Sequence, residues 1–253
     1  LRAPDVMAPL LLDAGTGLRE AGLRARHFTE QHLLLSHLHW DHIQGLPFYE
    51  PLFDPDFHLT IHTCHPWAEE ALRTQMSEPF FPLSFDQLPA RITVEVHEDQ
   101  EMFEAGGFLV YVSKQCHPGD SFGYRICRGD RVVVFSTDAG RKDFGRCEKC
   151  KCPHLFAAAD LLIYDAMLSE EEEKGAKRDW GHSSNVSAVR FGALCKVRQL
   201  ALTHHSPKND DAKLDAIYAE TLALAEERRT AQKWPERVLE KIWMARDGLE
   251  ITV

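Results

Sequence analysis

Residues 36–42 read Ser-His-Leu-His-Trp-Asp-His, and four of these side chains are common metal ligands: His37, His39, Asp41 and His42. The apolar residues 33–35 before them predict a buried strand, and residues 43–46 after them predict the start of a helix. Burying three imidazoles and a carboxylate without partners would cost too much free energy. The stretch therefore predicts a divalent-cation site on a strand-to-helix loop, where metals commonly serve chemistry.

Composition limits the class of protein. The chain has 253 residues, and we predict one large α/β domain over residues 1–253. Its net charge is −10, so stable nucleic-acid binding is not expected, because phosphates need a cationic surface. No apolar stretch approaches the roughly 18 residues of a membrane span. Seven cysteines, several in apolar surroundings, and the lack of a signal-peptide pattern predict a reducing, cytoplasmic location.

Several apolar, strand-like runs end in a single His or Asp. These residues are Asp13, His117, Asp138, Asp165 and His204. Because ligands gather at the carboxyl ends of strands in α/β sheets, we expect these side chains to converge. Further strands are predicted at 58–62, 92–96 and 123–127, helices at 66–76, 184–195 and 211–232, a helix start at 170–173, and a closing strand pair around 247–248.

The ordered motifs resemble those of the metallo-β-lactamase fold superfamily. The matching residues are Asp13 in the first motif, His37, His39, Asp41 and His42 in the second, His117 in the third, Asp138 in the fourth and His204 in the fifth. The resemblance covers nearly the whole chain and implies the α/β (α+β) class, as a four-layer αβ/βα sandwich. The superfamily usually opens with a further strand pair before the position of Asp13, so we expect that pair to be missing here.

The resemblance also implies a dinuclear metal site. One ion would be held by His37, His39 and His117, the other by Asp41, His42 and His204, with Asp138 bridging both and Asp13 orienting a ligand histidine. Imidazoles and carboxylates suit Zn²⁺, with Mn²⁺ or Fe²⁺ as alternatives. Two such ions lower the pKa of a shared water towards about 7, which gives a hydroxide nucleophile.

His182, in Trp-Gly-His-Ser-Ser, resembles a histidine of the ribonuclease Z-like phosphodiesterase branch, which includes a cyclic-phosphate diesterase. There the matching histidine contacts the phosphate and assists the leaving oxygen. The implied catalytic residues are His182, Asp41 and Asp165, with Asp165 orienting His182. Ribonuclease Z carries a tRNA-grasping arm between the third and fourth motifs, but only residues 118–137 lie there in this chain, enough for a hairpin. We therefore predict a small or cyclic phosphodiester substrate.

Other features remain open. The pattern C-x2-C-x-C-x-H, formed by Cys147, Cys150, Cys152 and His154, predicts either a structural zinc site or a reduced, exposed loop. Trp40, Phe48, Phe80 and Phe81 are candidates for stacking on a base. A homodimer is expected only by analogy with the branch. His32, His58, His62, His65 and His97 have no matching neighbours in the sequence and are predicted to be surface or strand histidines.

Alternative functions use the same residues. A carboxylic ester, thioester or lactone could be hydrolysed at the same metals, or the chain could be an RNA-processing nuclease. A metal-holding sensor without activity is the third alternative, although a binding module has no need of an activated water.

Overall fold

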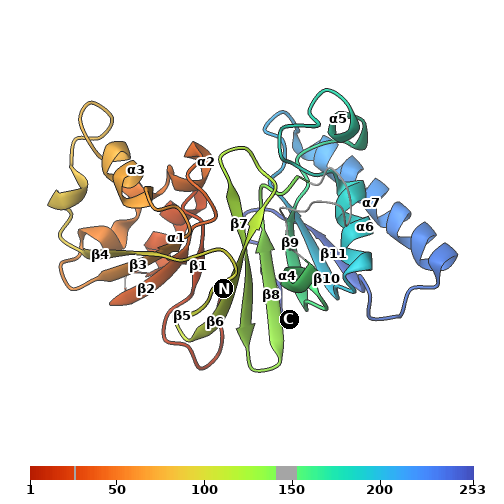
Figure 1. Cartoon of the computed structure of the whole chain (residues 1–253), viewed down its shortest axis with the longest axis horizontal. Helices are drawn as coiled ribbons and strands as arrows, with labels where there is room; N and C mark the ends of the chain where they lie inside the picture. The colour runs from red at the N-terminus through yellow and green to blue at the C-terminus, as the bar shows by residue number, and fades with distance from the viewer. Residues whose placement is uncertain (26, 141–152) are drawn as a thin grey trace. The chain divides into compact units, whose positions relative to one another are not determined.

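The computed structural model describes residues 1–25, 27–140 and 153–253, and it comprises two compact units, Leu1–Leu109 and Val110–Val253. Each unit contains both strands and helices (Figure 1). Among the described residues, no helix combines the length and the apolar character that a bilayer crossing requires.

The first unit is built on a parallel four-stranded sheet in the order β1-β2-β3-β4. Its strands are β1 (Leu11–Leu12), β2 (Glu30–Leu34), β3 (His58–Thr63) and β4 (Arg91–Val96), and its helices are α1 (Gly17–Ala25), α2 (Trp40–Ile43) and α3 (Ala68–Gln75). Leu33 and Ile61 of the sheet pack with Leu18 of α1 and Leu72 of α3 in one apolar cluster. The two helices therefore cover the same face of the sheet.

The second sheet has seven strands in the order β11-β10-β9-β8-β7-β6-β5. They are β5 (Met102–Ala105), β6 (Phe108–Gln115), β7 (Ser121–Arg128), β8 (Arg131–Ser136), β9 (Leu161–Asp165), β10 (Gln199–Thr203) and β11 (Lys241–Met244). Strands β8 to β11 run parallel, whereas β7 and β8 form an antiparallel hairpin. Because β8, β9 and β10 are parallel neighbours, the residues that follow them meet at one edge of the sheet.

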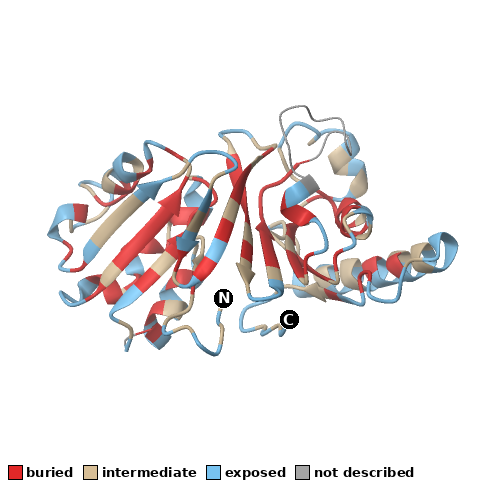
Figure 2. Cartoon of the chain, turned by 60° about the horizontal axis from the view of Figure 1, so that its bottom comes forward, coloured by how far each residue is buried: buried red, intermediate tan, exposed pale blue. Residues whose placement is uncertain are grey.

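The second unit contains four helices among its described residues. They are α4 (Pro153–Phe156), α5 (Glu170–Lys174), α6 (Asn185–Leu194) and α7 (Asp211–Gln232). Phe191 of α6 and Ala225 of α7 belong to the same apolar cluster as Leu162 and Leu200 of the sheet. Figure 2 shows the buried residues concentrated in the strands of both sheets, with the exposed residues on the helices and loops.

Most predicted elements are confirmed, and three are corrected. Helix α1 begins at Gly17, inside a glycine-rich stretch that reads as a turn, and the short strand β5 was not predicted. The closing strand pair around 247–248 is wrong, because β11 ends at Met244 and no strand follows it. Among the described cysteines, Cys64, Cys127 and Cys195 are free thiols.

Candidate metal centre

The motif of residues 36–42 leaves β2 as an extended segment and then enters α2. His39 is extended, with φ −61° and ψ 150°, and α2 begins at Trp40 rather than at Ile43, so Asp41 and His42 lie in its first turn. The ring centroid of His37 is 4.5 Å from that of His39 and 4.2 Å from that of His42. His42 Nε2 lies 3.3 Å from Asp41 Oδ2. The change from strand to helix thus gathers all four side chains of the motif.

Asp13, directly after β1, organises this loop through its carboxylate. Oδ1 accepts the backbone N–H of Ser36 at 2.7 Å, and Oδ2 accepts the Ser36 hydroxyl at 2.8 Å and Nδ1–H of His42 at 2.7 Å. Since the Ser36 hydroxyl donates to Asp13, its oxygen is left to accept Nδ1–H of His37 at 3.0 Å. Both imidazoles therefore carry their proton on Nδ1, which leaves the lone pair of Nε2 for a metal ion.

Two glycines let the Asp13 turn approach the loop. A Cβ on Gly15 would lie 2.7 Å from the carbonyl oxygen of Asp41, and a Cβ on Gly45 would lie 2.0 Å from that of Gly15. The segments are joined by Ala14 N–H donating to the carbonyl of His42 and Gly45 N–H donating to that of Ala14, each at 2.8 Å. Larger residues at either glycine would separate Asp13 from His42.

In the second unit the corresponding residues follow neighbouring strands. Asp138 follows β8 and His204 follows β10, and Nε2 of His204 lies 3.3 Å from Oδ2 of Asp138. His117 follows β6, with Nε2 3.6 Å from Oδ1 of Asp138. Thr137 Oγ1 donates to Oδ2 of Asp138 at 2.6 Å and restrains the carboxylate. Asp138 is therefore the residue that both histidines approach.

Three of these residues have left-handed backbone conformations. The φ angle is 55° at Asp13, 49° at Asp138 and 56° at His204. A positive φ is uncommon for residues other than glycine and costs free energy, so it persists only where the surroundings enforce it. Each of the three comes directly after or within two residues of the end of a strand, and such conformations concentrate at functional sites.

His117 is oriented by a glycine from a distant part of the chain. Its Nδ1–H donates to the carbonyl oxygen of Gly181 at 3.0 Å, which leaves Nε2 directed at Asp138. Gly181 has φ +80°, and a Cβ there would lie 2.5 Å from Cδ of Pro118 and 2.6 Å from Nδ1 of His117. Only glycine fits this close approach without displacing the histidine.

His182 is held by Asp165, which ends β9. Nδ1–H of His182 donates to Oδ2 of Asp165 at 2.7 Å, while Oδ1 accepts the backbone N–H of Met167 and of Ser183, each at 3.1 Å. The His182 ring stacks on that of His204 at a centroid distance of 5.1 Å. The sequence predicts this pairing from motif resemblance alone, and the structure brings the two side chains together.

The donor set fits divalent metal ions. Asp138 and His204, two of the predicted ligands, have ligand atoms within 4.8 Å of each other, and side-chain atoms of Asp165 and His182 lie within the same distance of both. His37 and His42 in the first unit and His117 in the second bond through Nδ1 and present Nε2, and zinc-binding histidines are oriented in this way. Neutral imidazoles together with carboxylates suit Zn²⁺ and, less selectively, Mn²⁺ or Fe²⁺.

The predicted zinc cluster lies mostly outside the described part of the chain. Its three cysteines, Cys147, Cys150 and Cys152, belong to the segment 141–152, which is not described, and its fourth residue, His154, is exposed in α4.

A second histidine cluster, which was not predicted from the sequence, lies in the first unit. Nδ1–H of His32 donates to Nε2 of His62 at 2.8 Å, Nδ1–H of His62 to Nε2 of His97 at 3.0 Å, and Nδ1–H of His97 to Glu101 at 3.0 Å. Burial, followed by the neighbouring His32 and His97, lowers the pKa of His62 to about 3. The signal in the sequence is the alternation of side chains along this strand. Leu59 and Ile61 face the apolar cluster beneath the helices, so His62, the next residue, lies on the opposite face of the sheet. We call these three residues the histidine ladder.

Comparison with known proteins shows the family of the chain. Residues 9–205 match a family model described as "Beta-lactamase superfamily domain". A ribonuclease Z of Picosynechococcus sp. is 26% identical over 276 aligned residues, covering 88% of this chain and 84% of the relative.

Solved structures give the fold. The metallo-beta-lactamase fold protein YhfI of Bacillus subtilis superposes with a TM-score of 0.64 at 19% identity, covering 95% of this chain and 85% of its own. A diphosphatase from the PhnP family superposes with a TM-score of 0.59 at 20% identity, covering 94% of this chain and 76% of its own. These likenesses confirm the predicted α/β sandwich class.

Proposed function

Because the chain belongs to the beta-lactamase superfamily, whose members include metal-dependent hydrolases, we propose that it hydrolyses a small phosphodiester at a dinuclear metal site. The proposed ligands are those predicted from the sequence: His37, His39, Asp41, His42, His117, Asp138 and His204. Zn²⁺ is the proposed native metal. When bound, two such ions supply an activated water and stabilise negative charge that develops on the phosphoryl oxygens.

The observation that carries the proposal is the His182–Asp165 pair beside Asp138 and His204. Departure of an alkoxide from phosphorus needs a proton, and an imidazolium held by a carboxylate through Nδ1 can deliver one from Nε2. An alkoxide also leaves in the hydrolysis of a carboxylic ester or lactone, so the preference for a phosphodiester comes from the resemblance of Gly181-His182-Ser183 to the phosphodiesterase branch. His182 is therefore the proposed general acid, and Asp165 fixes its tautomer and orientation.

The segment between His117 and Asp138 favours a small substrate over tRNA. The described residues of this interval form the hairpin β7–β8 and its connections, as the sequence predicts, with no further element. The ribonuclease Z relatives nonetheless keep an RNA-processing nuclease as the second candidate. The net charge of −10 argues against it, because affinity for RNA depends on neutralising phosphates.

A substrate panel tests the proposal. The purified protein, loaded with Zn²⁺ or with Mn²⁺, would be assayed with bis(p-nitrophenyl) phosphate, cyclic mononucleotides, linear dinucleotides, a precursor tRNA and a lactone. We expect turnover of the small phosphodiesters in preference to the tRNA and the lactone. Lactone turnover without phosphodiester hydrolysis would overturn the proposal in favour of the ester-hydrolase alternative, and preferential cleavage of the tRNA would favour the nuclease.

The leaving group separates the role of His182 from general damage. p-Nitrophenolate departs without protonation, whereas a nucleotide oxygen does not. In His182→Ala we expect kcat to fall by about 100-fold or more for a cyclic nucleotide, and by far less for bis(p-nitrophenyl) phosphate. Equal losses for both substrates would contradict the assignment of His182 as the acid.

A further inference from the structure

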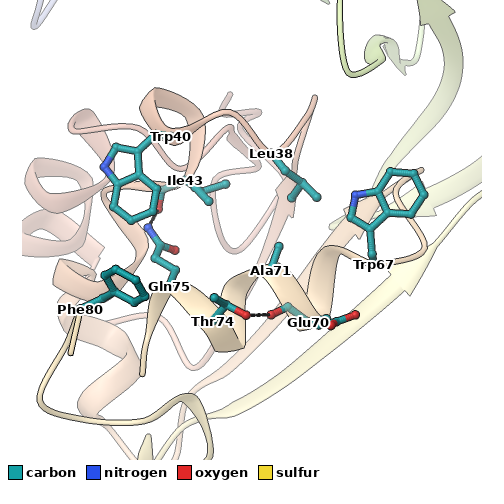
Figure 3. Close-up of a pocket in the computed structure, with 9 residues that line it drawn as sticks. All are labelled: Leu38, Trp40, Ile43, Trp67, Glu70, Ala71, Thr74, Gln75 and Phe80. Carbon is teal, nitrogen blue, oxygen red and sulfur yellow. Dashed lines mark hydrogen bonds between the residues drawn. The ribbon is translucent and has the colours of Figure 1, made fainter. Parts of the chain in front are cut away.

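An open pocket of about 540 Å³ lies in the first unit, between the metal-binding loop and helix α3. Three exposed aromatic side chains, Trp40, Trp67 and Phe80, stand around it (Figure 3). They are 59%, 54% and 65% exposed, which is unusual for large aromatic residues unless they contact a ligand or partner. We call this feature the aromatic pocket. Its volume is in the range of small-molecule sites.

The wall of the pocket is part of the metal-binding motif itself. Leu38 and Trp40 line the pocket, and they alternate in sequence with His37, His39 and Asp41. Because residues in an extended segment project to opposite sides in turn, the side chain of Leu38 faces away from its two histidine neighbours. When the metal ligands of this loop bind the phosphate of a substrate, the group attached to that phosphate can therefore reach the pocket.

Gln75 gives the pocket a specific polar requirement. Its Nε2 donates to the backbone carbonyl of Ile43 at 2.9 Å, which fixes the orientation of the amide. Its Oε1 is buried and has no hydrogen-bond partner among the described residues, although Gln75 lines the pocket and is itself only 5% exposed. A buried acceptor without a donor is unfavourable, so a ligand that supplies an N–H there would gain affinity. Figure 3 shows the amide oxygen turned away from Ile43.

The charge of the lining excludes a phosphate as the occupant. Among the nine described residues that line the pocket, the only charged side chain is that of Glu70, which is exposed. The nearby cation, Arg73, is engaged by Glu69 and Asp86 on another side of α3. The pocket thus suits a flat, uncharged group with a hydrogen-bond donor.

We propose that the aromatic pocket binds the nucleobase of the substrate, and that Gln75 Oε1 selects a base with an exocyclic amino group. The proposal rests on the proposed phosphodiesterase function and names its substrate class as a nucleotide with an amino-bearing base. Aromatic side chains provide stacking that tolerates any base, and the single acceptor provides the selection. Of the four aromatic residues predicted from the sequence, Trp40 and Phe80 line the pocket, whereas Phe48 and Phe81 pack on each other at 5.8 Å.

Nucleoside binding to the zinc-loaded protein tests the subsite without any turnover. Adenosine and inosine differ in that inosine replaces the exocyclic amino group by an oxygen, which would face Gln75 Oε1. We expect adenosine to quench tryptophan fluorescence and to bind about tenfold more tightly than inosine. Trp67→Leu and Phe80→Ala should each weaken adenosine binding about tenfold. Phe48→Ala is the matched control, since Phe48 is 58% exposed but does not line the pocket, and it should leave adenosine binding unchanged.

The outcomes separate the subsite from the reaction. Equal affinity for adenosine and inosine, or a loss in Phe48→Ala as large as that in Phe80→Ala, overturns the proposal. Hydrolysis of bis(p-nitrophenyl) phosphate without binding of either nucleoside at millimolar concentration overturns the subsite but leaves the phosphodiesterase function in place. Selective adenosine binding by a protein that hydrolyses no phosphodiester supports the subsite and overturns the proposed function.

Discussion

Oδ2 of Asp165 accepts Nδ1–H of His182 at 2.7 Å, and this single contact fixes which nitrogen of the imidazole is available to a substrate. The carboxylate is fully buried at the end of β9, and its second oxygen is held by two backbone N–H groups, so it has little freedom to turn away. An imidazole held in this manner keeps one tautomer and stabilises its own protonated form.

Asp165→Asn tests this contact with almost no change in shape. The amide can donate to Nδ1 instead of accepting from it, which would favour the wrong tautomer of His182. We expect kcat for a cyclic nucleotide to fall by about 100-fold or more, with a small effect on bis(p-nitrophenyl) phosphate, as for His182→Ala. Asp160→Asn, just before the other end of the same strand, is the matched control. Asp160 pairs with Arg131 and Arg198, so its loss should lower stability without changing the dependence on leaving group.

Asp13→Asn should weaken metal binding. The asparagine tolerates the left-handed conformation at this position but loses the charge that orders Ser36 and His42. Removing an outer-sphere partner of a ligand typically costs about 10- to 100-fold in metal affinity, and we expect a loss of that size in a competitive zinc titration. Asp54→Asn is the control, because the side chain of Asp54 accepts the backbone N–H of Asp56 within its own turn. An unchanged zinc affinity in Asp13→Asn would contradict the role given to Asp13.

Gly181→Ala should disturb His117 from a distance of 64 positions in the chain. The added Cβ would press on Pro118 and on the His117 ring, so we expect zinc affinity to fall together with stability. Gly129→Ala is a close control, since Gly129 also has a positive φ of 56° but a Cβ there meets no atom within 4 Å. Both variants should lose about 1–2 kcal/mol of unfolding free energy through backbone strain. Only Gly181→Ala should also lose zinc, and equal zinc affinities in the two variants would refute the steric argument.

The histidine ladder should make stability depend on pH. The pKa of His62 is lowered to about 3 in the folded protein, mainly by burial, against an ordinary value of 6.5. Between these values the unfolded chain binds more protons, so the unfolding free energy is highest above about pH 6.5 and falls as the pH decreases towards 3. This group alone contributes at most about 1.4 kcal/mol per pH unit.

His62→Gln should flatten that profile, as measured by urea unfolding at several pH values in the presence of a chelator. His58→Gln is the control, because His58 lies on the same strand but bonds to Thr93 outside the ladder. A profile for His62→Gln with the same slope as that of the unsubstituted protein would show that His62 does not control the acid sensitivity.

Local signals in the sequence predicted much of the fold. Helix α7 has the predicted bounds, Asp211–Gln232, and is capped by Asp210, whose side chain accepts the N–H of Lys213. Helix α6 is capped by Ser184, one of the two predicted caps. Both depend on hydrogen bonds between residues close in sequence, which a pattern can reveal.

The missed features depend on contacts that are distant in sequence. The ladder joins His62 to His97 across neighbouring strands, and their alignment follows from the register of β3 on β4. No local pattern specifies that register. Helix α1 was missed because Gly15 and Gly17 suggest a turn, whereas Gly15 is required by its close approach to Asp41. In both cases the residue type has a tertiary cause.

The left-handed backbones at Asp13, Asp138 and His204 limit how these positions can be redesigned. The left-handed conformation sets the direction of each side chain directly after a strand. A longer substitute would therefore place its donor atom beyond the metal-binding position, and a β-branched substitute would also disfavour the left-handed backbone. Exchange of Asp138 for Glu, often treated as conservative, should therefore be as damaging as its removal. Attempts to alter the metal preference of this protein have better prospects at Asp41, which is exposed in a helical turn and can accommodate new ligands without backbone strain.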